Sequence, residues 1–235
     1  MKRFYTSVSV AAAEGAAGGW EVRLDGRVIR SPAKAPLVFA SQALAQGVAA
    51  EWEAQGDEVH PNAMPLMQLA STAVDVVGKQ RDGIVTAVAK YAETDLLCYR
   101  AERPQALIDR QAQAWQPLLD WATLRYDAPL HVCAGLMPKP QPADATRALR
   151  HAVEALDDWT LSALQLATGA CGSLVVALAL IEGRVDAAEA FAVSQVDETF
   201  QIEQWGEDPE ATKRRAALRA DIASARRFVD LLRAG

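Results

Sequence analysis

Three side chains near the end of the chain could make directional contacts with a partner: Glu198, Gln201 and Trp205. Their spacing of three and four residues places them on one face of a helix, because successive residues turn by about 100°. The roughly opposite face carries apolar residues that can pack on a core: Val193, Val196 and Phe200. A carboxylate, an amide and an indole presented together suit recognition of another protein better than catalysis. We therefore predict that Glu198, Gln201 and Trp205 bind a protein partner.

On pattern alone, two of these residues also have a purely structural interpretation. Glu198 could belong to a solvated helix face, and Trp205 could cover the core as a hydrophobic cap. Gly206 is expected to end the helix. Asp208-Pro209-Glu210 then opens the next helix, with Asp as the N-cap and Pro at the first helical position.

The rest of the sequence carries no recognisable enzyme or metal motif. The histidines are scattered: His60, His131 and His151. His131 and Cys133 lack the second pair of ligands that a zinc site needs. Residues 169–173 only superficially resemble a nucleophile elbow, because they lie inside an apolar helical run. Residues 15–19 are rich in glycine, but no Lys-Ser/Thr follows them, so they are not a phosphate loop. We expect no catalytic residue, no metal and no cofactor.

Composition excludes several classes of partner. The chain has 235 residues, 51% of them hydrophobic, which is enough for a sizeable core. Its net charge of −6 argues against binding to nucleic acid or to anionic lipid, since both need a basic surface. The chain has three cysteines, Cys98, Cys133 and Cys171. A set that is small and odd in number does not indicate a disulfide framework. A reducing compartment is therefore expected.

The segment from Trp159 to Ile181 contains no charged residue and is long enough to span a bilayer. It nevertheless contains several polar residues and glycines, and no cluster of Lys or Arg flanks it. We predict a helix buried on all sides within a helical bundle, and no integral membrane segment. The alternative is a membrane-associated assembly factor anchored by this segment.

The N-terminal part has the pattern of a small antiparallel sheet. Residues 4–10 are rich in aromatic and β-branched residues, and residues 20–24 alternate apolar and polar. Asp25-Gly26 predicts a tight hairpin turn into a return strand over residues 27–30. Residues 14–19 are expected to form a loop, and residues 37–39 a further short strand.

Helical periodicity begins near residue 41 and continues to the end of the chain. Expected helices cover residues 41–55, 67–77, 81–93, 104–126, 143–159, 159–181, 185–205 and 209–234, with a Pro-rich connection at 127–142 that could hold a short strand at 130–133. Ser41 is the expected first N-cap, and Tyr91 is expected on an apolar stripe. We predict an α+β fold: a small N-terminal antiparallel β-containing domain, residues 1–78, followed by a larger all-α domain, residues 79–235.

Short motifs along nearly the whole chain resemble one known family. In order they are Arg3-Phe4-Tyr5; Gly19-Trp20 with Leu24-Asp25-Gly26-Arg27; Glu51-Trp52 with Gln55; Pro61 with Met64-Pro65; Thr72-Ala73 with Asp75; Tyr91 with Thr94-Asp95-Leu96-Leu97 and Tyr99-Arg100; Gln111 with Trp115, Pro117-Leu118-Leu119 and Trp121; Gly172-Ser173; and Glu198 with Gln201 and Trp205-Gly206. This series resembles the ATP12 family of assembly chaperones for the F1 part of ATP synthase.

The resemblance implies a function. Family members hold the newly made α subunit of F1 soluble until the β subunit replaces the chaperone, so the implied partner is the F1 α subunit. An acidic residue of the C-terminal motif is important in the family and corresponds to Glu198. The chain begins without an import presequence, so it resembles a bacterial member acting in the cytoplasm. Residues 207–210 depart from the Trp-Ala-His-Asp of mitochondrial members, so contacts beyond Trp205 are not carried over.

An enzyme of unknown class is the competing interpretation. Glu198 or Asp197 would then act as a general base in a cleft between the two predicted domains. A deep pocket lined by carboxylates would favour the enzyme, whereas a broad, shallow apolar surface would favour the chaperone.

Overall fold

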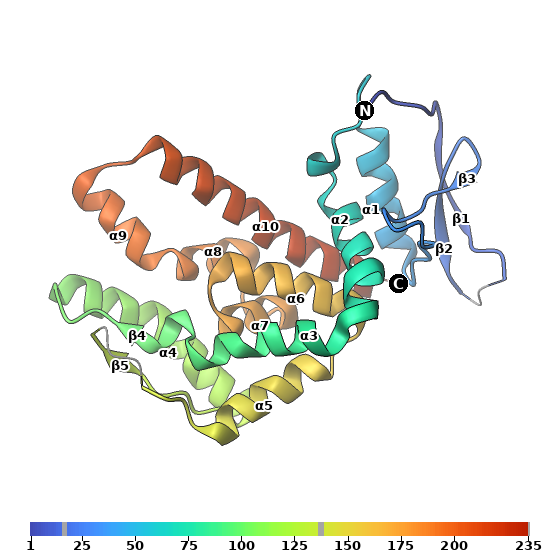
Figure 1. Ribbon diagram of the computed structural model, residues 1–235. Helices are drawn as coiled ribbons and strands as arrows, with labels where there is room; N and C mark the ends of the chain where they lie inside the picture. Colours follow the sequence, from blue (N-terminus) through green and yellow to red (C-terminus); the bar gives the residue numbers. More distant parts are fainter. Residues whose placement is uncertain (16–17, 136–138, 235) are drawn as a thin grey trace. The chain divides into compact units, whose positions relative to one another are not determined.

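The computed structural model describes residues 1–15, 18–135 and 139–234. Two compact units make up the chain (Figure 1). The first contains Met1–Arg81, Asp158–Ala163 and Ser224–Gly235, and the second contains Asp82–Asp157 and Leu164–Ala223. The predicted domains, residues 1–78 and 79–235, stay a prediction. Parts of the loop expected at 14–19 and of the connection expected at 127–142 lie outside the described residues.

A three-stranded antiparallel sheet opens the first unit, in the order β1 (Val8–Ala12), β2 (Trp20–Leu24) and β3 (Arg27–Val28). The turn between β2 and β3 has positive φ at both central residues, 48° at Asp25 and 78° at Gly26. A two-residue turn of this kind matches the twist of the strands that it joins. The predicted hairpin at Asp25-Gly26 is therefore confirmed.

Three of the strands expected from the sequence are shorter in the structure. The return strand expected over 27–30 ends at Val28. The first strand begins at Val8, not at residue 4, because the backbone N–H groups of Thr6 and Ser7 donate to the Asp25 carboxylate at 3.1 and 2.9 Å. Residues 37–39 form only a single bridge, in which Phe39 pairs with Trp20. Side-chain acceptors near a turn thus replace part of the expected strand pairing.

Helix α1 (Gln42–Glu53) packs against this sheet, and α2 (Pro65–Thr72) packs against α1. Ala73–Val77 continues α2 as a π-helical turn. Ser41 caps α1 as predicted, since its hydroxyl accepts from the Leu44 N–H at 3.4 Å. The buried Glu51 carboxylate accepts from the N–H groups of Leu66 and Met67 at 2.8 and 2.9 Å. It therefore satisfies the otherwise unpaired amides at the start of α2.

Residues from much later in the chain complete the core of the first unit. Trp159 lies 5.6 Å from Phe39 and stacks 6.1 Å from Phe228, measured between ring centroids. The Ser41 hydroxyl donates to the Leu231 carbonyl at 2.6 Å. These contacts explain why the first unit includes residues 158–163 and 224–235.

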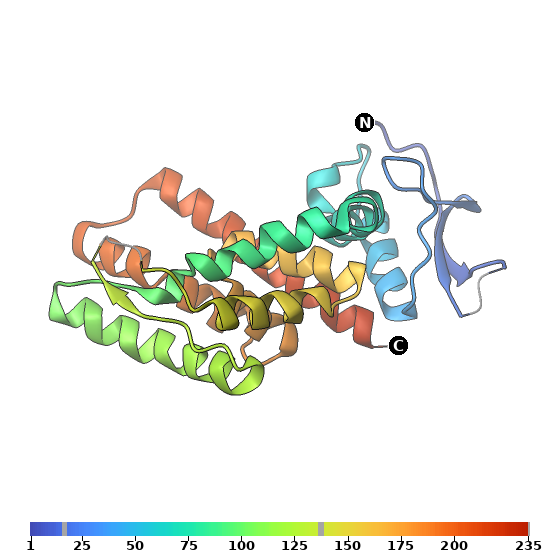
Figure 2. The same cartoon turned by 60° about the horizontal axis from the view of Figure 1, so that its bottom comes forward.

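The second unit is mainly helical (Figure 2). Its helices are α3 (Gly78–Ala89), α4 (Gln105–Tyr126), α5 (Ala143–Glu154), α6 (Asp158–Cys171), α7 (Leu174–Glu182), α8 (Ala187–Ser194), α9 (Val196–Trp205) and α10 (Pro209–Arg233), of which α3, α6 and α10 extend into the first unit. Short 3-10 turns occur at Pro61–Ala63 in the first unit and at Lys90–Glu93 and Leu96–Cys98 in the second. Of the strand suggested at 130–133, only Cys133 lies in a strand: β5 (Cys133–Ala134) pairs in parallel with β4 (Tyr99–Arg100), and residues 130–132 are not paired in a sheet. The predicted fold class, a small antiparallel sheet followed by a helical region, is confirmed.

The uncharged segment from 159 to 181 is two helices, which corrects the single helix that we expected. Gly172 adopts φ of 65° and ends α6, and the Ser173 hydroxyl caps α7 by accepting from the Val176 N–H at 3.0 Å. A positive φ followed by a serine N-cap is a strong stop and restart signal. Within the described part of the chain, no helix is both long enough and apolar enough to cross a bilayer.

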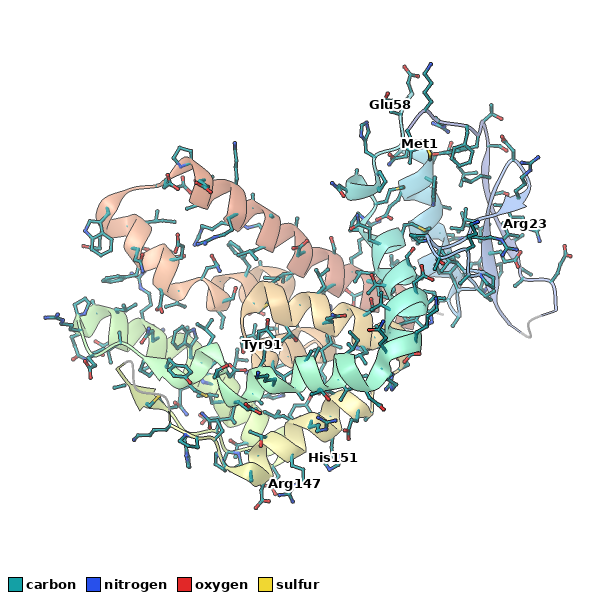
Figure 3. All side chains as sticks on the ribbon, in the orientation of Figure 1. Met1, Arg23, Glu58, Tyr91, Arg147 and His151 are labelled. Atoms are coloured by element: carbon teal, nitrogen blue, oxygen red, sulfur yellow. The ribbon has the colours of Figure 1, made fainter. Side chains whose placement is uncertain are left out.

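Two further expectations were wrong. The helix expected over 185–205 breaks at Gln195, whose φ of −117° and ψ of 22° lie outside the helical region. Val193 therefore belongs to α8 and does not share a helix face with Val196 and Phe200. Tyr91 lies in the 3-10 turn after α3 and is 37% exposed, not buried on an apolar stripe (Figure 3).

Candidate functional site: the α9 helix and its supports

Helix α9 is short, amphipathic and held from two sides. Val196 and Phe200 are buried on its inner face, as the sequence predicts. Figures 1 and 2 both show α9 between α4 and the N-terminal part of α10. Gly206, with φ of 87°, ends the helix in a conformation that favours glycine. The helix is therefore a defined element with one buried and one open face.

Helix α4 fixes α9 through polar contacts. The Gln111 Nε2 donates to the Asp197 carboxylate at 2.7 Å, and Gln111 is itself almost fully buried. Arg110 forms a two-oxygen contact with Glu203, at 2.8 and 2.9 Å, and its guanidinium lies 5.4 Å from the centre of the Phe200 ring. Charge-assisted bonds at both ends of the helix limit its sliding and rotation.

A buried tryptophan of α4 fixes the entry into α9. The Trp115 Nε1 donates to the Val193 carbonyl at 2.9 Å, just before the break at Gln195. On the other side, the Arg215 guanidinium of α10 donates to the side-chain oxygens of Gln195 and Thr199 at 3.2 and 3.1 Å. The break between α8 and α9 is thus held by side chains of both neighbouring helices.

Glu198 is partly exposed and only weakly engaged. Its carboxylate lies 3.9 Å from the guanidinium of Arg214, and 28% of the Glu198 side chain is exposed. That separation exceeds a hydrogen bond, so the pair is a loose surface ion pair that contributes little to stability. The oxygens of Glu198 consequently keep acceptor capacity for an incoming Arg, Lys or amide donor.

Gln201 and Trp205 face solvent on the same side of α9. Gln201 is exposed, and Trp205 is 79% exposed at the last residue of the helix. The structure therefore does not place Trp205 as a cap on the core of this chain. Tryptophan is enriched among the residues that contribute most to binding at protein interfaces, so an exposed indole beside a carboxylate and an amide is suited to anchoring a partner. The three residues predicted as partner-binding do lie together on one open face.

The supports of α9 were not identified as functional residues from the sequence. Gln111 and Trp115 appeared only within family motifs, and Arg110, Arg214 and Arg215 were not singled out. One signal was present: Lys213-Arg214-Arg215 is a basic run in a chain with a net charge of −6. Nothing in sequence spacing, however, pairs a residue near 110 with one near 200.

Other groups that could carry chemistry are engaged in the fold. Burial raises the pKa of the Cys98 and Cys171 thiols to about 12, which makes them poor nucleophiles. The buried carboxylate of Asp95 accepts from the Ser173 hydroxyl at 2.7 Å and from the Val175 N–H at 3.1 Å, although burial raises its pKa. It stabilises the start of α7. Among residues 1–15, 18–135 and 139–234, no group of three His, Cys, Asp or Glu could hold a metal ion.

A family model and a curated relative both match this chain. The family model described as ATP12 chaperone protein matches residues 2–123. A curated relative, the mitochondrial protein atp12 of Schizosaccharomyces pombe, is 24% identical over 199 residues, which cover 79% of this chain and 68% of that protein.

Two solved structures share the fold. The crystal structure of Atp12 from Paracoccus denitrificans superposes with a TM-score of 0.93, and its sequence is 42% identical to this one. The match covers 99% of this chain and 98% of that one. An Asp-to-Lys mutant of the P. denitrificans protein matches with the same values. The family match over residues 2–123, together with this identity along almost the whole chain, shows that the chain belongs to the ATP12 family of chaperone proteins.

Proposed function

We propose that this chain is an assembly chaperone for the F1 part of ATP synthase. In this role it binds the unassembled α subunit in the cytoplasm and prevents its aggregation until the β subunit replaces it. Membership of the ATP12 family supports the assembly role. The observation that carries a binding function for this chain is the open face of α9, where Trp205 is 79% exposed beside Gln201 and Glu198.

The physical task of such a chaperone is to cover an apolar surface temporarily. A subunit awaiting its partner exposes an interface patch large enough to aggregate. An exposed indole supplies contact area at low entropic cost, because its side chain has only two rotatable bonds. The Glu198 carboxylate adds directional pairing with Arg, Lys or an amide, which improves specificity more than affinity.

The supports of α9 fit reversible binding. Contacts from α4 and α10 hold the helix before the client arrives, so less conformational entropy is lost on binding. Recognition through one short helix face still leaves a modest interface, which a larger subunit interface can displace. We propose that the chain acts by binding alone, with no catalytic step.

Co-expression tests this function. We expect F1 α subunit to be recovered in the soluble fraction in the presence of this protein and to aggregate without it. F1 β subunit expressed in the same way should show no such dependence. Equal aggregation of α with and without this protein would reject the proposal, and rescue of β alone would assign a different client.

A further inference from the structure

A second surface of the same unit has the chemistry of a docking site. A groove of about 480 Å³ lies between α8 and α10, floored by Phe191 and small residues and bordered by Thr199 and two arginines. The small residues are Ala187, Ala188, Ala192 and Ala223. Methyl side chains leave the backbone open to close approach, so a partner segment can lie deep in the groove.

The two arginines place positive charge directly above the apolar floor. The guanidinium carbons of Arg219 and Arg215 lie 4.5 and 5.4 Å from the centre of the Phe191 ring. Both distances are within the range of a cation–π contact with the ring. Arg215 is further oriented by its hydrogen bonds to the side chains of Gln195 and Thr199.

Within the described chain, neither of these two charges is neutralised by an ion pair. Neither Arg215 nor Arg219 forms an ion pair with a carboxylate among the residues that the structure describes. Residues 209–223 of α10 contain four basic and two acidic residues, whereas the whole chain carries −6. A pair of oriented guanidinium groups without carboxylate partners is suited to binding carboxylates with two hydrogen bonds each.

We propose that this groove binds an acidic amphipathic segment of the protein client, with aliphatic side chains against Phe191 and the alanines and carboxylates on Arg215 and Arg219. The inference rests on the proposed chaperone function for the identity of the client. The groove adjoins the open face of α9, because Thr199 lines it and directly follows Glu198. A client would then present complementary charges to both sites: a basic group to Glu198 and acidic groups to the groove.

Peptide binding to the full-length protein tests the site itself. The probes are two fluorescein-labelled peptides with the same leucine positions, Leu-Glu-Glu-Leu-Leu repeated three times and Leu-Lys-Lys-Leu-Leu repeated three times. We expect the acidic peptide to bind more tightly than the basic one, as measured by fluorescence anisotropy, with binding that weakens at least tenfold between low and high salt. Equal binding of both peptides, or no binding of the acidic one, would overturn the proposal.

Two variants locate the binding in the groove. Arg219→Glu reverses a guanidinium charge, and Ala192→Trp fills the groove without changing charge. Each substitution should weaken binding of the acidic peptide at least tenfold. The control is Arg147→Glu on α5, which changes an exposed arginine outside the groove (Figure 3) and should alter the affinity less than twofold. Thermal unfolding confirms folding, and Arg219→Gln replaces Arg219→Glu if the latter fails to fold. If the folded Arg219 and Ala192 variants bind the acidic peptide with unchanged affinity, the groove is not its binding site.

Retention of F1 α subunit in a pull-down separates the two proposals. If wild-type protein retains α and Arg219→Glu and Ala192→Trp reduce retention, both proposals are supported. If wild-type protein retains α and both variants retain it equally, the groove inference fails and the chaperone function stands. If wild-type protein retains no α, the chaperone function fails and the groove is judged by the peptides alone.

Discussion

Glu198 and Trp205 lie seven residues apart on α9 and are left open in different ways. Trp205 is exposed because the helix ends at that residue, and no other described part of the chain covers it. Glu198 is only partly exposed, and its neighbour Arg214 stands too far away to use its hydrogen-bonding capacity. Trp205 offers apolar surface and Glu198 offers a weakly paired charge, so substitutions at the two positions should have different effects.

Charge reversal at Glu198 should abolish client binding without unfolding the protein. In Glu198→Lys, the new ammonium lies beside Arg214 and repels a basic client group, so we expect at least tenfold less α subunit in a pull-down. Thermal unfolding should change little, since the lost pair is a loose surface pair. Glu53→Lys, an exposed charge reversal at the end of α1, is the matched control. Undiminished retention by folded Glu198→Lys would reject this role.

Truncation of Trp205 should weaken binding and leave stability almost unchanged. The side chain is 79% exposed, so Trp205→Ala should alter the free energy of unfolding by less than about 0.5 kcal/mol. A binding anchor of this type contributes on the order of 2 kcal/mol, or about a thirtyfold change in affinity. Urea unfolding and pull-down measure the two effects. A loss of about 3 kcal/mol or more in stability would instead indicate a core residue.

Asp25 should make the first unit sensitive to acid. Hydrogen bonds from Ser7 and Thr6 lower the pKa of its carboxyl from 3.8 to about 2. A carboxyl with a lowered pKa in the folded state stabilises the fold above its unfolded pKa, and this contribution is lost as pH falls from about 4 to 2. The variant Asp25→Asn removes the charge, and Asn tolerates the positive φ of this position. The difference in urea midpoint between wild type and Asp25→Asn should therefore shrink over this pH range. A constant difference would exclude the carboxylate as the cause.

At the scale of elements, the sequence predicts best where one local signal is decisive. Asp25-Gly26 specifies a hairpin, and Ser41 specifies a helix start, because each residue acts on its own backbone. The break at Gln195 could not be predicted from the sequence, since no Gly or Pro marks it and contacts from α4 and α10 maintain it. The separation of α6 from α7 could have been predicted from Gly172-Ser173, which favour a helix end and a new helix start. The uncharged run around them instead indicated one continuous buried helix. The open face of α9 followed from periodicity, whereas its supports depend on tertiary contacts.

The start of α7 should depend strongly on Ser173. Its hydroxyl accepts from the Val176 N–H and donates to the buried Asp95 carboxylate at 2.7 Å. Ser173→Ala removes the cap and takes a donor from a buried charge, so we expect a loss of about 1–3 kcal/mol in urea unfolding. Thr212→Ala, which removes an exposed hydroxyl on α10, should cost less than about 0.5 kcal/mol. Equal losses in the two variants would show that the Ser173 contacts add nothing.

At the scale of the whole molecule, the first unit is built from three separate stretches of chain. The ring of Phe228 is fully buried and stacks on Trp159, and both residues come from outside the first 81. Gly47 of α1 allows the close approach, because a Cβ there would lie 2.7 Å from a methyl carbon of Leu231. The sheet and its two helices therefore depend on residues at the far end of the sequence.

A fragment containing only residues 1–81 should fail to fold cooperatively. It lacks the aromatic and aliphatic side chains that 158–163 and 224–235 supply to its core, and a lost buried Phe alone costs about 3–5 kcal/mol. Circular dichroism and amide proton dispersion of this fragment should show a largely unfolded chain. Mixing it with a peptide of residues 224–235 should restore part of the structure. A sharply dispersed spectrum from the fragment alone would contradict the dependence.

This arrangement has a consequence for biosynthesis. A ribosome makes proteins from the N-terminus, and domains generally fold as units while the chain emerges. Here the first unit has to wait for the C-terminal part of α10, which is translated long after the sheet and the first two helices. Its unfinished core stays exposed until α10 has been synthesised. The nascent chain thus passes through an aggregation-prone stage, and a premature stop codon or frameshift before α10 would damage the part of the protein that was made first.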